Sequence, residues 1–457
     1  MLFRSVKDVF SIGHGVAVVA ENTWAAMQGR KQLVITWDEG PRAGNSTAGL
    51  RAAWAKQAET PGQQVQNAGN VDQVLAGAAK KIEAVYEAPY LSHAPMEPLN
   101  ATVLVTDTKC DVWVGTQIQT VAMQAAAMAT GLKESQIEIH TLYLGGGFGR
   151  RGGEDYVEEA VEVAKHMKGT PVKTVWTRED DLQHDTYRPA SYTKFIAALD
   201  AEGYPAAIHA KVVSPPFGQP GVQTEGIRDM KYAVPNFRVE QHSPDVGIPV
   251  SYWRSVGYSQ NTFFMESFLD ELATAAGKDP LEYRRKLLEK QPRMLAVLNL
   301  AAEKAGWGKP LPAGRFRGIA VVSNIGSFNA QVAEVSVTGG KVKVHKVTCA
   351  VDCGVVVNPA IVAQQIESGI VYGLGPALKH GITLDKGRVT NTNFNSYDPT
   401  RIDETPEIEV HIIPSTANPG GTGEASTPTT PPAVLNAVYA ATKKRIRVLP
   451  ALQKDLA

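Results

Sequence analysis

Apolar and polar positions recur with the period of a strand or of a helix over most of the chain, and this pattern predicts a mixed α/β fold. Near the start it predicts a strand at 15–20, a helix at 23–31 and a second strand at 32–37. No repeat of short period is present. The elements predicted beyond residue 82 are strands at 101–106, 110–115, 137–144 and 171–177, helices at 119–130, 155–167, 259–290, 360–378 and 433–448, and strand-rich stretches at 190–250 and 317–352.

The length of the chain predicts several domains, because 457 residues exceed what one hydrophobic core usually holds. The pattern divides the chain into four ranges, 1–40, 41–81, 82–290 and 291–457. Residues 41–81 are rich in Ala, Gln, Gly and Asn, and we expect a helical linker there.

The charge balance excludes some classes of partner. Lys plus Arg and Asp plus Glu both number 46, so the formal net charge is zero. This balance argues against nucleic acid or an anionic membrane surface as the main partner. No apolar run is long enough to span a bilayer, and the first ten residues do not have the pattern of a signal peptide. The pattern leaves the compartment open between cytoplasm and periplasm.

Cysteine usage limits the redox chemistry. The chain has three cysteines, Cys110, Cys349 and Cys353, and none of them forms a CxxC pair. Three thiolates cannot build an iron–sulfur cluster with four cysteine ligands, and an odd, low count is not a secreted disulfide framework. If the protein transfers electrons, they must leave through another chain or through a cofactor without thiolate ligands.

A glycine-rich loop, 145–153, lies between the strand at 137–144 and the helix at 155–167. Such a loop offers backbone N–H groups to an anion or an oxo group. One interpretation is dinucleotide binding, since Gly147, Gly149 and Gly152 fit G-x-G-x-x-G and Glu179 follows the next strand. A tight structural turn is the alternative.

A second glycine-rich segment, Pro419-Gly-Gly-Thr-Gly-Glu424, carries a single carboxylate. Glycines let a ligand approach the backbone closely. Glu424 is therefore a candidate general base if its surroundings raise its pKa toward neutrality. The alternative is a surface turn whose acid caps the following helix.

Four segments taken together resemble the molybdenum-binding subunit of the xanthine oxidase family of molybdenum hydroxylases. They are Gly145-Gly-Gly-Phe-Gly149, Ser251-Tyr-Trp-Arg-Ser-Val-Gly257, Val351-Asp-Cys-Gly-Val-Val-Val-Asn-Pro359 and Gly420-Gly-Thr-Gly-Glu424. The likeness is closest to the isoquinoline 1-oxidoreductase β subunit and to aldehyde and nicotinate dehydrogenases. It implies two molybdopterin-binding domains, at 82–290 and 291–457, after a partial α/β-hammerhead segment at 1–40.

The resemblance also implies roles for individual residues. Glu424 would be the catalytic base, and the arginine beside the pterin and substrate would be Arg254. No side chain would bind the metal, because dithiolene sulfurs hold molybdenum in this family. The residues that would bind the cofactor are Gly146, Gly147, Phe148, Gly149, Arg150, Arg254 and Gly423.

The implied reaction is hydroxylation of an N-heteroaromatic compound or oxidation of an aldehyde, with water as the oxygen source. The implied cofactor is molybdenum–molybdopterin cytosine dinucleotide. Electrons would pass to a small partner subunit with 2Fe–2S clusters, and a cytochrome c subunit is a further expected partner. The cofactor would supply the redox chemistry, and the protein would orient the substrate and tune proton affinity.

Two departures from the family pattern affect these expectations. Arg150 and Arg151 stand where a lysine and a purine-binding glutamate are common, which argues against xanthine as the substrate. Arg150 is expected either to contact the pterin phosphates or to belong to a solvated pair beside a turn. The family's Gly-Gln-Gly segment is absent, so the chain resembles the C-terminal portion of such a subunit. A separate polypeptide is the expected source of the missing portion.

Two other functions remain as alternatives. One is a scaffold that keeps the fold without a complete cofactor site. The other is a nicotinamide-dependent dehydrogenase that uses the loop from Gly147 to Gly152. Molybdenum content separates the scaffold from the hydroxylase.

Overall fold

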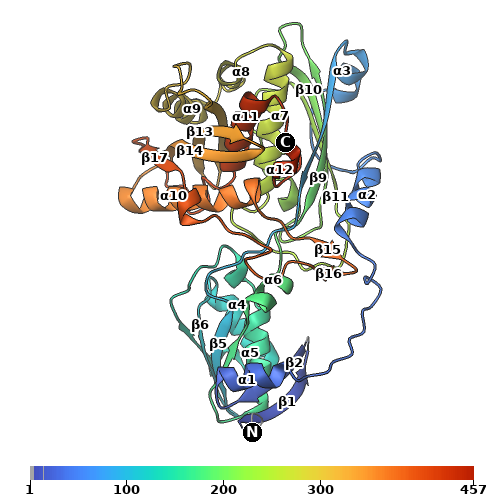
Figure 1. The fold of residues 1–457 in the computed structure, drawn as a ribbon, viewed down its shortest axis with the longest axis vertical. Helices are drawn as coiled ribbons and strands as arrows, with labels where there is room; N and C mark the ends of the chain where they lie inside the picture. The colour runs from blue at the N-terminus through green and yellow to red at the C-terminus, as the bar shows by residue number, and fades with distance from the viewer. Residues whose placement is uncertain (1–4, 14, 457) are drawn as a thin grey trace. The chain divides into compact units, whose positions relative to one another are not determined.

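The computed structural model of the protein describes residues 5–13 and 15–456. Residues 1–4 and 14 of the range 1–40, and residue 457 of the last range, lie outside the described residues. The described residues form two units, each built from segments that are distant in the sequence (Figure 1). The first unit comprises 5–44, 92–186 and 386–393, and the second comprises 45–91, 187–385 and 394–456.

The first unit contains a four-stranded sheet in the order β7–β6–β5–β8. Its strands are β5 (Asn100–Val105), β6 (Cys110–Val114), β7 (Ile137–Thr141) and β8 (Val172–Val175). β6 and β7 are parallel, and the other two pairs are antiparallel. Buried and partly buried positions alternate along β5 and β6, as expected for strands with one face against a core.

Two helices cover this sheet. Figure 1 shows α4 (Gln119–Thr130) and α5 (Asp155–His166) lying together along it. Three small residues of α4, Ala122, Ala125 and Ala126, are buried against α5 and the strands. A shorter helix, α6 (Arg178–Gln183), follows β8, and its first turn is capped by Thr177.

The start of the chain forms a hairpin and a helix in the same unit. β1 (Val6–Ile12) pairs antiparallel with β2 (Gly15–Ala20), and α1 (Thr23–Arg30) begins after its cap Asn22. The strand predicted at 32–37 is wrong. This segment has no regular secondary structure after a turn at residue 32 and pairs with no strand among the described residues, and Val34 is 97% exposed.

The second unit contains a five-stranded sheet in the order β3–β11–β10–β9–β4. Its strands are β3 (Gln63–Ala68), β4 (Lys81–Ala88), β9 (Ser191–Leu199), β10 (Pro205–Val213) and β11 (Asn236–His242). Only β10 and β11 are parallel. Because β3 lies within 41–81, the range predicted to be a linker contributes an edge strand to this sheet.

A second sheet of the same unit has the order β12–β13–β14–β17. Its strands are β12 (Phe316–Asn324), β13 (Ser327–Thr338), β14 (Lys341–Asp352) and β17 (Glu407–Ile412). Helix α11 (Thr430–Thr442) packs directly on β12 at Gly318. A β-carbon at Gly318 would lie 2.2 Å from the backbone nitrogen of Ala437, so this contact requires glycine.

Helix α7 (Tyr258–Ala275) forms the centre of the second unit, and Figure 1 shows it beside α11 and the long strands. Phe263, Phe264 and Phe268 of this helix belong to the main hydrophobic core. Glu266 is also buried, but its Oε2 accepts from the guanidinium of Arg284 at 2.9 Å and from a strand N–H at 3.0 Å. The pairing offsets the cost of burying the charge.

The remaining elements connect these layers. They are α2 (Thr47–Gln57), α3 (Val71–Gly77), α8 (Pro280–Leu287), α9 (Pro292–Lys304), α10 (Pro359–Leu378), α12 (Gln453–Leu456), β15 (Leu384–Asp385), β16 (Arg388–Val389) and the short 3₁₀ turns η1 (Glu134–Gln136), η2 (Arg150–Gly152), η3 (Val222–Thr224) and η4 (Ile402–Glu404). Among the described helices, none combines the length and the apolar character that a membrane crossing requires. The mixed α/β fold class is confirmed.

Candidate active site

The glycine loop of the first unit leaves β7 and has an unusual backbone. Phe148 has φ of 57°, and its neighbour Gly149 has φ of 109°, so the loop turns through the left-handed region. A β-carbon at Gly147 would lie 2.5 Å from Gln117 Oε1, and Gln117 Oε1 accepts from the N–H of Gly149 at 3.1 Å. Two of the glycines are therefore explained by the fold itself.

One donor of this loop has no acceptor. Gly147 is buried, and its backbone N–H donates to no described residue. Buried N–H groups are almost always paired, so an unpaired one indicates a place where a ligand or water accepts. The position of this N–H thus fits an anionic or oxo group.

Both arginines after the loop are fully buried. Arg151 donates to the carbonyl of Gly146 at 2.8 Å and to Glu97 Oε2 at 2.9 Å. The same carboxylate oxygen of Glu97 accepts from the N–H of Gly145 at 2.8 Å. These contacts hold the start of the loop, and the alternative of a solvated arginine pair is wrong.

Arg150 makes ion pairs at both ends of its guanidinium. Its two terminal nitrogens donate to Asp155 at 2.8 and 2.7 Å, and its Nε lies 3.0 Å from Asp185. The guanidinium also lies over the ring of Trp176 at 5.4 Å. These contacts favour a role within the protein, and binding of cofactor phosphates by Arg150 stays a prediction.

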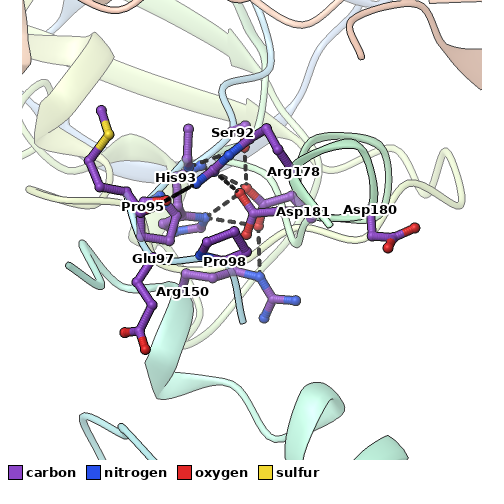
Figure 2. Close-up of polar contacts among 12 residues, drawn as sticks. Ser92, His93, Pro95, Glu97, Pro98, Arg150, Arg178, Asp180 and Asp181 are labelled. Carbon is purple, nitrogen blue, oxygen red and sulfur yellow. Dashed lines mark hydrogen bonds and ion pairs between the residues drawn. The ribbon is translucent and has the colours of Figure 1, made fainter. Parts of the chain in front are cut away.

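Asp185 contacts four groups in a fully buried cluster, three through hydrogen-bonding atoms and one through an ion pair, and part of the cluster is drawn in Figure 2. The Ser92 hydroxyl and the N–H of His93 donate to Oδ2 at 2.6 and 2.7 Å, and His93 Nδ1 lies 3.0 Å from Oδ1. Arg150 is the fourth. Burial alone would raise the pKa of Asp185, but His93 and Arg150 outweigh it and hold the pKa at about 2. His93 is thus structural rather than a metal ligand.

Asp181 is a second buried carboxylate beside this cluster. Arg178 pairs with its Oδ2 and also donates to the carbonyl of Met96 at 3.1 Å. No described residue forms a hydrogen bond with Oδ1. Burial and the charge of Asp185 raise the pKa of Asp181 to about 7, against the effect of Arg178.

Glu424 of the second unit lies at the end of a tightly packed glycine segment. A β-carbon at Gly420 would lie 2.5 Å from the carbonyl carbon of Gly326, and the N–H of Gly421 donates to the carbonyl of Ile325 at 2.8 Å. The turn between β12 and β13 therefore holds this segment. Burial raises the pKa of Glu424, although the backbone of Ser255 and the charge of Arg254 act against it.

Arg254 is buried beside the same segment. Its Nε donates to the carbonyl of Gly423 at 2.6 Å, and a terminal nitrogen donates to Ser368 at 3.0 Å. The guanidinium lies 5.7 Å from the ring centre of Tyr372. No carboxylate of the described residues forms an ion pair with it, so an anion could approach without displacing one.

Further polar groups near Glu424 lack partners. Ser327 lies against Gly420, and Thr427 lies against the position where a β-carbon of Gly369 would be. The hydroxyl groups of both are buried and form no hydrogen bond with a described residue. Such groups indicate bound water or a ligand that supplies the missing partners.

A second carboxylate is coupled to Glu424. Glu225 precedes α7, and a β-carbon at Gly257 would lie 3.0 Å from its Cβ. Burial and the charge of Asp229 raise the pKa of Glu225, and the charge of Glu424 raises it further. The sequence did not indicate Glu225 or Asp185, because neither belongs to a motif and the residues that link them to the site, Glu424 and His93, are distant in the sequence.

The residues of the dinucleotide alternative do not form the required unit. β7 and β8 lie at opposite edges of the sheet, so no parallel strand pair follows the loop. Glu179 instead accepts from the side chain of Asn393 at 2.8 Å. The geometry does not favour dinucleotide binding.

Only one group of possible metal ligands occurs among the described residues, and it consists of Asp111, Glu138 and His140. Lys109 already pairs with Asp111 at 2.9 Å and with Glu138 at 2.7 Å. The ammonium group balances the carboxylates, so this surface cluster does not indicate a metal.

Comparison with protein families gives two matches to the molybdopterin cofactor-binding domain, over residues 56–288 and 300–406. A membrane-bound aldehyde dehydrogenase (pyrroloquinoline-quinone) of Gluconacetobacter polyoxogenes is 30% identical over 96% of this chain and 62% of its own length. Isoquinoline 1-oxidoreductase subunit beta of Brevundimonas diminuta is 29% identical over 97% of this chain and 60% of its own length. The chain thus spans less than two thirds of the length of these relatives.

Solved structures share the fold. Quinoline 2-oxidoreductase from Pseudomonas putida 86 matches with a TM-score of 0.81 at 15% identity, covering 99% of this chain and 88% of that one. Reconstituted CO dehydrogenase from Oligotropha carboxidovorans matches with a TM-score of 0.78 at 14% identity, covering 96% of this chain and 84% of that one. The likeness extends over nearly the whole chain.

Proposed function

Because the chain belongs to the xanthine oxidase family of molybdopterin cofactor-binding proteins, we propose that it is the molybdenum-binding part of an oxidoreductase. Its substrate would be an N-heteroaromatic compound, which is hydroxylated, or an aldehyde, which is oxidised. The observation that carries the proposal is Glu424, a partly buried carboxylate of raised pKa beside a buried arginine without an ion pair.

Glu424 would act as the general base. A higher pKa makes its carboxylate a stronger proton acceptor. The carboxylate would accept the proton that water loses as its oxygen adds to the substrate. Arg254, with the carbonyl of Gly423 as its anchor, would orient an electron-rich oxygen of substrate or cofactor.

The cofactor would be molybdenum–molybdopterin in its cytosine dinucleotide form. When bound, it would supply the two-electron oxidation of the substrate. The N–H of Gly147 is a donor without an acceptor and fits an oxygen of this group, and the conformation of Gly146, Phe148 and Gly149 presents it. Arg150 would stabilise the loop through its ion pair with Asp185. To bind a phosphate of the cofactor, its guanidinium would have to break an ion pair with a carboxylate.

Electrons would leave through a partner. The three cysteines are buried and unpaired, and burial raises the pKa of Cys110 to about 11 and that of Cys349 to about 12. Three cysteines are also too few for a cluster with four thiolate ligands. We therefore propose a small subunit with 2Fe–2S clusters as the acceptor, with a cytochrome c subunit and a polypeptide that supplies the remaining family portion as further partners.

Elemental analysis of molybdenum tests the cofactor. The chain is purified alone and after co-expression with its proposed partners. We expect about one molybdenum per chain in the co-expressed complex. Absence of molybdenum from both preparations would support the scaffold alternative. Extraction of pyrroloquinoline quinone, the cofactor printed in the name of the aldehyde dehydrogenase relative, would contradict the molybdenum cofactor.

The variant Glu424→Gln tests the base. We expect unchanged molybdenum content and a loss of kcat on quinoline- or aldehyde-type substrates of about 10²- to 10⁴-fold. Glu303→Gln is the control, because this carboxylate lies on α9 and is 72% exposed. Full activity of Glu424→Gln would exclude Glu424 as the base.

A further inference from the structure

The turn Trp253–Gly257 has a backbone that its residues do not favour. Ser255 has φ of 75° and Val256 has φ of 52°, so two consecutive residues other than glycine lie in the left-handed region. For a β-branched residue such as Val256 this is an outlier. Strain of this kind persists only where surrounding contacts enforce it, and it is concentrated at functional sites.

The surroundings enforce this turn from both sides. The N–H of Val256 donates to the carbonyl of Trp253 at 2.6 Å, and Trp253 stacks on Tyr372 of α10 with ring centres 4.7 Å apart. After the turn, the Ser259 hydroxyl donates to the carbonyl of Val256 at 2.8 Å. Helix α7 therefore begins immediately behind a turn that cannot relax.

The strained turn holds the segment of Glu424 by two successive contacts. The Arg254 guanidinium donates to the carbonyl of Gly423 at 2.6 Å, and the Ser255 hydroxyl donates to the carbonyl of Glu424 at 2.7 Å. Arg254 and Ser255, which are adjacent in the turn, thus bind the adjacent carbonyl groups of Gly423 and Glu424. Both side chains contact the same strip of backbone, and one of them belongs to Ser255, which has the left-handed conformation.

We propose that the turn Trp253–Gly257 is a strained positioning device for Glu424, in which Ser255 is the positioning residue and Val256 carries the strain. This inference rests on the proposed role of Glu424 as the base. Its physical content is that the two hydrogen bonds from a turn held in one strained conformation fix the backbone of Gly423 and Glu424, and so the carboxylate, where proton transfer occurs.

Two variants of the holoenzyme complex separate the effect of the Ser255 hydrogen bond from the effect of the backbone strain. Ser255→Ala keeps the backbone strain and removes the hydrogen bond to Glu424, and we expect kcat per molybdenum to fall about 10- to 100-fold with KM unchanged. Val256→Gly removes the strain and lets the turn sample other conformations, so we expect kcat to fall in the same way while the melting temperature of the chain is maintained or rises.

A matched control tests whether relief of strain by itself lowers activity. Lys443 also has a positive φ, of 59°, but it caps the C-terminus of α11. Lys443→Gly should leave kcat unchanged. A readout independent of activity is amide hydrogen exchange of residues 420–426 in the full chain, which we expect to quicken in Ser255→Ala and to stay unchanged in Lys443→Gly.

The outcomes distinguish this inference from the proposed function. If Glu424→Gln is inactive but Ser255→Ala and Val256→Gly keep normal kcat, the positioning role is wrong and the base remains. If Glu424→Gln is active, the proposed function fails first. If Val256→Gly does not fold, the kcat of Ser255→Ala alone still tests the positioning role. This variant removes only the hydrogen bond to the carbonyl of Glu424 and introduces no glycine.

Discussion

Arg150 and Asp185 form an ion pair in which Nε and Oδ1 are 3.0 Å apart and neither side chain is exposed to solvent. The same carboxylate accepts from Ser92 and His93, which precede β5, whereas Arg150 directly follows the glycine loop. One buried charge therefore joins two segments that are more than fifty positions apart in the sequence. The ion pair thus links the glycine loop to the segment before β5.

Removal of the charge should destabilise the protein. Asp185→Asn leaves Arg150 buried with less compensation, and we expect the free energy of unfolding to fall by about 3 kcal/mol or more. Urea denaturation of the full chain measures this loss. Asp107→Asn is the control, because Asp107 is 85% exposed and its pair with Lys168 should contribute less than about 1 kcal/mol. Equal effects of the two variants would contradict the prediction.

Asp181 should make stability depend on pH. Its pKa is about 7 in the folded chain, above the ordinary 3.8, so the folded state favours the protonated form. The stabilisation is present below pH 4 and is lost as pH rises toward 7, by on the order of 4 kcal/mol. Relative to wild type, Asp181→Asn should therefore gain stability across this window. A difference in the free energy of unfolding that does not change between pH 4 and 7 would exclude this role.

Glu225 should influence the proton affinity of Glu424. The charge of Glu424 raises the pKa of Glu225, and the coupling between two charges acts in both directions. Glu225→Gln removes a negative charge near Glu424, so the pKa of Glu424 should fall. In the loaded complex, the acid limb of the kcat/KM profile should move to lower pH, with Glu282→Gln on α8 as the control. A profile that is unchanged or moves to higher pH would contradict the coupling.

Gly318 should tolerate no side chain. A β-carbon there would lie 2.2 Å from Ala437 N and 2.3 Å from Ala433 O, both backbone atoms of α11. We expect Gly318→Ala to lower the free energy of unfolding by about 3 kcal/mol, since α11 must shift away from β12. Gly77→Ala is the control, because a β-carbon at Gly77 would meet no described atom within 4 Å. Calorimetry of both variants checks the contrast.

Local sequence patterns predicted many elements because their cause is local. The pattern predicts a helix at 119–130, and α4 has these bounds, since an Ala- and Met-rich run ends at Gly131 with φ of 74°. The opposite case is 32–37, where β-branched residues favour a strand but no neighbouring strand is present among the described residues. Propensity alone does not form a sheet.

Some residues of the candidate site could likewise be predicted from the sequence, and others could not. Glu424 and the glycine loop are visible in the sequence because their residue types are unusual and close together. Asp185 lies outside every quoted motif, and the segment 251–257 indicated Arg254 but not Ser255. The roles of both residues come from contacts with residues 92–93 and 424 that no local pattern encodes. The glycines at 147 and 420 suggested a ligand, yet contacts with Gln117 and Gly326 already require them.

The exposed segment at 32–37 affects how the chain behaves in solution. Its backbone groups form no ladder with a described strand, and Val34 and Trp37 are 97% and 51% exposed. An apolar stretch of this kind is a template for cross-β stacking with identical copies. Concentrated preparations of the lone chain should therefore bind amyloid dyes, and the charge introduced by Val34→Lys should act as a gatekeeper that delays this transition.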